Sequence, residues 1–276
     1  MKKLFNFMAF LCLGFALSWT LTACGDDDED GDNKDKEEQN DLNGKDDDED
    51  DLATEKNART LSVTIDESGL TYDDLTIHVN DIDIVHNNVP FGKVKVTIDD
   101  LPVSVAEIKK LKLPSGMTSF RQSPYLQPML IVAALNQMNY NKDNARKMLD
   151  YVVKGVKSEN RDGKMVHFPG DDATKAYPSN WSQANQYKKF DKVRSYLDGA
   201  KYANNYTPEK PYTMTITLTD YSYTADPDYV QLWLTSIQLN DPKELGIWKY
   251  DSDNDGEYDT YWSSTFMHLL HSIAEY

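Results

Sequence analysis

One stretch near the C-terminus has the residue types and spacing of a calcium-binding loop. Calcium takes about six to eight oxygen ligands, which known loops supply from acidic side chains at alternate positions, with a glycine at the sixth and a carbonyl at the seventh. Gly256 occupies the glycine position here, and the Glu257 carbonyl the next. The expected ligands are Asp251, Asp253, Asp255, Glu257 and Asp259. The spacing predicts a structural Ca²⁺ ion that braces a turn.

A second interpretation of this loop stays open. The twelfth position of an EF-hand loop carries a bidentate glutamate, and this chain has Trp262 there. The flanking residues 247–250 and 258–262 are aromatic arms that indicate strands, not helices. Asn254, Asp255 and Gly256 also favour a tight β-turn. The loop is either a calcium site or an exposed acidic turn between two strands.

The other reactive side chains form no recognisable catalytic motif. His268 and His271 are three residues apart and would share a helix face, but no third metal ligand is evident nearby. The sequence contains no nucleophile elbow, His-Glu-x-x-His or phosphate-loop pattern. Paired carboxylates arise by chance among 46 acidic residues. We therefore expect a non-catalytic interaction domain, with a hydrolase that uses acidic residues as an alternative.

The aromatic residues add one more functional candidate. Exposed aromatic rings on a surface protein can stack on sugars, which would make the chain a glycan-binding subunit. The alternative is that Trp233 and the aromatic residues of the two arms are half-buried in a sheet. The tryptophans in question are Trp181, Trp233, Trp248 and Trp262.

The elements that position these residues alternate between strand and helix patterns. Period-2 alternation predicts strands within 61–103, at 214–218 and 230–234, and in the two arms. Ser104 and Asn141 are expected to cap helices, and residues 125–138, which are apolar on nearly every face, predict a buried helix. We expect an α+β fold in which small antiparallel sheet elements at both ends pack around a buried helical pair.

Three segments give weaker signals. Residues 157–180 are polar and rich in turn formers, which predicts a long loop. Ser182 is expected to cap a helix that ends at Gly199. Its buried face would carry Tyr187, Phe190, Val193 and Leu197. Residues 266–273 fit a strand or a helix.

Part of the chain resembles a known family. The stretches 195–200 and 204–213, with Asn204-Asn205-Tyr206-Thr207-Pro208 as the most specific part, are similar to an uncharacterised family of exported bacterial proteins. The likeness covers about residues 104–276 and implies an α+β domain with no known activity. The chain departs from the family in its longer polar loop, in residues 235–243 and in the acidic turn.

The N-terminus has the pattern of an export signal. Lys2 and Lys3 precede an apolar stretch, residues 4–17, which is short of the roughly 20 residues of a membrane span. Leu21-Thr22-Ala23-Cys24 resembles a bacterial lipobox, and the resemblance implies cleavage before Cys24 and lipidation of that residue with acyl chains such as palmitate. Two or more acyl chains hold a protein stably, because each buried methylene contributes roughly 0.8 kcal/mol.

Most of the negative charge follows Cys24 directly. Residues 24–60 contain 17 acidic and 5 basic residues, so they carry most of the net charge of −17. This composition predicts a disordered acidic tether. An acidic run after the lipidated cysteine also resembles the surface-export signal of lipoproteins in one Gram-negative phylum. The expected location is the outer membrane, facing the cell surface, and the lack of a basic patch argues against nucleic acid as a partner.

Four segments follow from these patterns: a signal peptide (1–23), a tether (24–60), an N-terminal β segment (61–103) and an α+β domain (104–276). The expected partners are the membrane, through the lipid anchor, and an unknown protein or glycan. Cys12 and Cys24 are the two cysteines, so the folded part lacks disulfides and thiolate sites.

Overall fold

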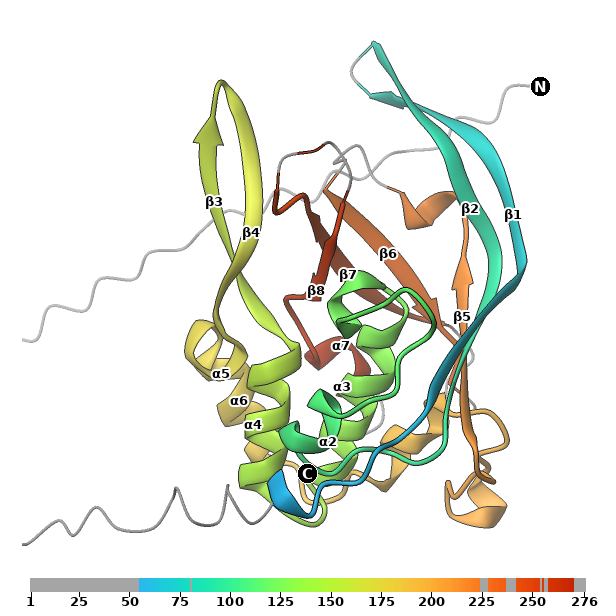
Figure 1. Cartoon of the computed structure of the whole chain (residues 1–276), viewed down its shortest axis with the longest axis vertical. Helices are drawn as coiled ribbons and strands as arrows, with labels where there is room; N and C mark the ends of the chain where they lie inside the picture. Colours follow the sequence, from blue (N-terminus) through green and yellow to red (C-terminus); the bar gives the residue numbers. More distant parts are fainter. Residues whose placement is uncertain are drawn as a thin grey trace, which may run out of the picture. The chain divides into compact units, whose positions relative to one another are not determined.

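The computed structural model describes residues 55–79, 81–223, 228–236, 242–253, 255 and 258–270. A six-stranded antiparallel sheet has the strand order β1-β2-β5-β6-β7-β8 (Figure 1). The strands are β1 (Val63–Val79), β2 (Ile82–Ile98), β5 (Tyr212–Leu218), β6 (Tyr229–Leu234), β7 (Lys243–Tyr250) and β8 (Thr260–Ser263). The fold is α+β, but strands from both ends of the chain join one sheet through the β2–β5 pairing, where two small sheets were expected.

Helices cover one face of this sheet (Figure 1). The longest are α3 (Leu126–Gln137) and α4 (Lys142–Val152), with α2 (Val105–Lys109) beside α4. Every second residue of the central strands is buried, as in Val94, Val96 and Ile98 of β2, and these side chains form one apolar core with the helices. Burying such side chains contributes about 1.5–3 kcal/mol each. The predicted buried helix is α3, which is buried on almost every side.

Local capping explains where two helices begin. The Ser104 hydroxyl accepts a hydrogen bond from the Glu107 N–H (3.3 Å), and the Asn141 side chain accepts one from the Asn144 N–H (2.9 Å). Both caps were predicted, because a serine or asparagine oxygen satisfies an N–H that has no partner within the helix. In a full capping box, the Glu107 carboxylate would also accept a hydrogen bond from the Ser104 N–H. Here it accepts from the Val103 N–H instead.

The segment 157–180 is not a long loop. It contains most of the hairpin formed by β3 (Lys154–Arg161) and β4 (Lys164–Asp172), then α5 (Ala173–Ala176) and the start of α6 (Pro178–Gln186). Asp162 and Gly163 turn the hairpin with φ values of 52° and 85°. This is the positive-φ pair that a tight two-residue turn needs, and an Asp-Gly dipeptide is a strong signal for it. The prediction failed because the strands are polar and bury only one residue, Gly155, fully, so they show no alternation of apolar residues.

The helix expected over 182–199 is also interrupted. Helix α6 ends at Gln186, and a 3₁₀ segment, Asp191–Tyr196, follows it. The four side chains predicted for the buried face are nevertheless buried. Residues Met267–Leu270 form a short helix, α7. Further 3₁₀ turns lie at Phe120–Gln122, Tyr202–Asn204 and Asp220–Ser222.

Several predicted features lie outside the described residues: the signal peptide with Cys24, the tether up to residue 54, Gly256, Glu257 and His271. Residues 55–60, the end of the predicted tether, are described and contact the domain, because Arg59 pairs with Asp100 and Glu107. None of the helices in the described part of the chain has the length and apolar character that a membrane-spanning helix requires.

Candidate functional site

The acidic loop between β7 and β8 brings three of the predicted calcium ligands together. Carboxylate oxygens of Asp251, Asp253 and Asp255 all lie within 4.8 Å of one another. Asp253 and Asp255 are exposed, and Asp251 is half-buried. The negative charge of Asp255 raises the pKa of Asp253 above its usual value. A divalent cation would relieve this repulsion, although exposed acidic groups also cluster without one.

Asp259, the fourth predicted ligand in the described residues, already has hydrogen-bond donors. Its carboxylate accepts from the Ser252 hydroxyl and from the Ser252 N–H (3.1 Å), and the hydroxyl is the main reason that its pKa is lowered. The Asp251 carboxylate accepts from the Asp255 N–H (3.2 Å). These bonds close the loop without a cation, so the alternative of an acidic turn remains open.

The aromatic residues beside this loop serve packing. Trp262 is fully buried, and its ring stacks on that of Trp248 with centroids 6.4 Å apart. The Trp248 ring also contacts His167 of β4 (4.6 Å) and Tyr229 of β6 (5.0 Å). These rings therefore hold the β3–β4 hairpin against the sheet. Among the described residues, the widely exposed rings are those of Tyr72, Tyr140, Tyr202 and Tyr221.

Histidine chemistry is limited in the described residues. His268 is exposed on α7. His167 Nδ1 lies 2.7 Å from the Ser158 hydroxyl oxygen, a contact that the sequence did not predict because the two residues are nine apart on different strands. Ser158 and His167 face each other directly across the exposed β3–β4 hairpin. A cross-strand hydrogen bond explains the pair.

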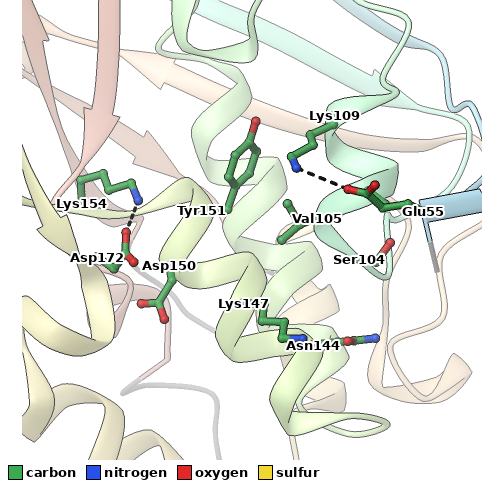
Figure 2. A pocket seen from close by; sticks show the side chains of 11 residues that line it. Glu55, Ser104, Val105, Lys109, Asn144, Lys147, Asp150, Tyr151, Lys154 and Asp172 are labelled. Carbon is green, nitrogen blue, oxygen red and sulfur yellow. Dashed lines mark hydrogen bonds and ion pairs between the residues drawn. The ribbon is translucent and has the colours of Figure 1, made fainter. Parts of the chain in front are cut away.

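A charged cavity of about 430 Å³ lies beside α2, α4 and the base of the β3–β4 hairpin (Figure 2). Two ion pairs cross its lining: Lys154 with Asp172, and Lys109 with Glu55 (3.6 Å). The charged lining residues are three lysines and three carboxylates: Lys109, Lys147, Lys154, Glu55, Asp150 and Asp172. The lining therefore has no net charge.

The polar groups of this charged cavity also have structural partners. The Asp150 carboxylate accepts from the Thr174 N–H (2.7 Å) and from the Thr174 hydroxyl (2.9 Å), and it fixes the start of α5. Ser104 caps α2. Asp150 and Asp172 are two carboxylates on one cavity, as the hydrolase alternative requires, but Asp150 accepts hydrogen bonds from Thr174 and Asp172 pairs with the Lys154 ammonium.

A second cavity, of about 400 Å³, is built from five separate segments and is called here the tyrosine cavity. Residues before β1 and after β2 supply Arg59 and Asp100, the C-terminal end of α3 supplies Asn136 and Gln137, and Tyr140 follows that helix. Two further lining residues, Arg194 and Tyr212, lie within or next to the stretches that carry the family resemblance. No spacing in the sequence indicates this grouping.

An ion-pair network supports one wall of the tyrosine cavity. Arg59 Nε lies 2.7 Å from Glu107, and Arg59 Nη1 lies 2.9 Å from Asp100, which also pairs with Lys210. Burial acts to raise the pKa of Glu107, but hydrogen bonds from Arg59 and the Val103 N–H outweigh it and lower that pKa. In the same way, Lys210, the Leu101 N–H and Arg59 outweigh the burial of Asp100 and lower its pKa.

Comparison with known proteins gives a family but no activity. A family described as a domain of unknown function (DUF6935) matches residues 100–273. The chain belongs to this family. The match covers nearly all of residues 104–276, where the sequence predicted an uncharacterised domain. It begins four residues earlier, just after β2, and ends at residue 273. No curated protein and no solved structure matches the chain.

Proposed function

We propose that this DUF6935 protein is a lipid-anchored lipoprotein of the cell envelope, displayed on the outer membrane toward the cell surface, and that its domain binds a partner without catalysis. The anchor is Cys24, within a lipobox-like stretch, and the acidic residues that follow form the spacer. Self-repulsion among these charges would extend the spacer and separate the domain from the membrane.

The non-catalytic part of the proposal rests on the polar groups around the charged cavity, which have structural partners within the protein. Its carboxylates accept hydrogen bonds or pair with lysines, and its serine caps a helix. A general acid or base must exchange a proton with the substrate through a free polar atom. The contacts of these groups instead use their polar atoms to join elements of the fold. The arrangement suits a rigid recognition surface better than proton transfer.

Calcium has a supporting role in this proposal. The proximity of Asp251, Asp253 and Asp255, within 4.8 Å, favours a cation that tightens the β7–β8 connection. The cation would contribute to the stability of the fold and not to a reaction, because the aromatic residues beside the loop serve packing.

Replacing Cys24 with alanine tests the anchor. In cells that express the full chain, the wild-type protein should fractionate with the outer membrane and be cleaved by protease added to intact cells. Cys24→Ala should appear in the soluble fraction. Cys12→Ala, which lies in the apolar part of the signal, is the matched control and should behave as wild type. A Cys24→Ala protein that remains in the membrane would refute the anchor.

A further inference from the structure

We infer that the tyrosine cavity is a binding site for a neutral saccharide. This inference rests on the proposed binding function and names its ligand class. A volume of about 400 Å³ falls within the roughly 300–1,000 Å³ that is usual for small-molecule sites. The lining combines tyrosine rings with amide and guanidinium groups, which match the alternating apolar and hydroxyl surfaces of a sugar ring.

Charge balance in the tyrosine cavity argues for a neutral ligand. Arg59 is compensated by Asp100 and Glu107, and Arg194 Nη2 lies 3.3 Å from Asp191. The C-terminal end of α3, which carries partial negative charge, lies at the same place. A phosphate or carboxylate ligand would meet these negative groups as well as the guanidinium groups, whereas sugar hydroxyls can donate to the former and accept from the latter.

Two amides belong to residues of the lining. The side chains of Asn136 and Gln137 form no hydrogen bond within the described residues, although Gln137 is only 7% exposed and Asn136 Oδ1 is buried. The neighbouring Asn139 shows the contrast, because its amide bonds Asp191 (3.2 Å) and the Phe190 N–H (2.9 Å). A buried amide without partners is costly, so a ligand that pairs with it gains affinity.

The tyrosines supply the apolar contact. Tyr140 is 68% exposed, at the rim, and Tyr212 is half-buried at the start of β5. Lys210 Nζ lies 5.7 Å from the centroid of the Tyr212 ring, so this ring already contacts the ion-pair network. Because Tyr140 is exposed, replacing it removes no core packing. A substitution at Tyr140 therefore tests binding without destabilising the fold.

An array of neutral oligosaccharides, from disaccharides to hexasaccharides of glucose, galactose, mannose and xylose, tests the inference. The full chain would be purified in a detergent without sugar headgroups, and hits measured by calorimetry. We expect at least one hit, with affinity lowered about tenfold or more by Tyr140→Ala and by Gln137→Ala. Tyr202→Ala is the matched control, since this tyrosine is 82% exposed outside the cavity, and should change affinity less than about twofold.

Two results would overturn the inference: no hit with protein that unfolds cooperatively, or binding that Tyr140→Ala leaves unchanged. Thermal unfolding of the Gln137→Ala variant separates loss of binding from loss of fold. The array does not depend on the membrane anchor. A negative array with a membrane-attached protein therefore refutes the saccharide site alone, and a positive array with a soluble protein refutes the anchor alone.

Discussion

Asp253 is the residue at which calcium binding is most directly tested. Its pKa is raised because the charge of Asp255 opposes ionisation, so the loop is strained electrostatically without a cation. A calcium concentration of about 100 times the dissociation constant would stabilise the fold by about 2.7 kcal/mol. We expect this to raise the Tm of the wild type by roughly 5–10 °C. Asp253→Asn should abolish most of the rise while slightly stabilising the protein in chelator.

The pH dependence of this effect follows from the raised pKa of Asp253. Protons compete with calcium as the pH falls through that raised pKa, so the stabilisation should fade at a higher pH than an unperturbed aspartate would give. Asp73→Asn, an exposed carboxylate change on β1, is the control and should keep the full calcium response. Identical Tm values for the wild type in calcium and in chelator would contradict a calcium role.

Glu107 makes the contact between Arg59 and the domain sensitive to acid. It accepts from Arg59 Nε (2.7 Å), Arg59 Nη2 (2.8 Å) and the Val103 N–H (3.0 Å) in a buried position. Because its pKa is lowered in the fold, its contribution is present above the ordinary pKa of about 4.3 and is lost as the pH falls through the lowered value. Glu107→Gln should cost about 2 kcal/mol at pH 7.

Urea unfolding at pH 7 and at about pH 3.5 measures this contribution. The wild type should lose more stability on acidification than Glu107→Gln does, since the variant has no carboxylate to protonate at that position. Glu67→Gln, an exposed change on β1, should leave stability at pH 7 within about 0.5 kcal/mol of the wild type. Equal acid losses in the wild type and Glu107→Gln would show that the Arg59 pair does not govern this region.

At the scale of elements, the contact between β6 and β7 depends on a glycine. A Cβ atom placed on Gly246 would lie 1.6 Å from the Tyr229 hydroxyl oxygen and 2.4 Å from the ring carbon that bears it. The Tyr229 ring therefore crosses directly over Gly246 and packs on Trp248. Gly246→Ala should cost about 2 kcal/mol by displacing the ring. In a Tyr229→Ala background the same change should cost less than about 0.5 kcal/mol.

Ultraviolet titration of the tyrosines gives a second reading of that displacement. Burial raises the pKa of Tyr229 to about 12, and a ring pushed outward by Gly246→Ala should titrate closer to the ordinary value of about 10. Chemical denaturation of the four variants of the cycle gives the coupling energy. Additive effects of the two substitutions would contradict the overlap of Tyr229 and Gly246.

The elements that could be predicted are those specified by local rules. Ser104 and Asn141 cap helices through their own side chains, and the apolar run at 126–135 cannot lie at a surface, so α3 follows from the sequence. The β3–β4 hairpin was missed because its strands bury little apolar surface and are held by the contact of His167 with Trp248. Asp162-Gly163 was the available signal.

At the scale of the whole molecule, the sequence indicated the acidic loop, whose residues are neighbours in the chain. It did not indicate the tyrosine cavity, whose residues come from distant segments. The predicted calcium ligands include three aspartates two residues apart in one loop, and their carboxylate oxygens lie within 4.8 Å of one another. The tyrosine cavity needs the pairing of β2 with β5, which brings residue 100 close to residue 212, and the end of α3 beside both. The sequence indicated neither that strand order nor the joining of both ends into one sheet.

The central claim is that Cys24 anchors this domain to the outer membrane by lipid. The most direct measurement is the intact mass of the wild-type protein extracted from membranes, with fragmentation of its N-terminal peptide. We expect a chain that starts at Cys24 and carries a diacylglycerol thioether and an N-acyl group. A chain cleaved at another residue, or one with an unmodified Cys24, would contradict it.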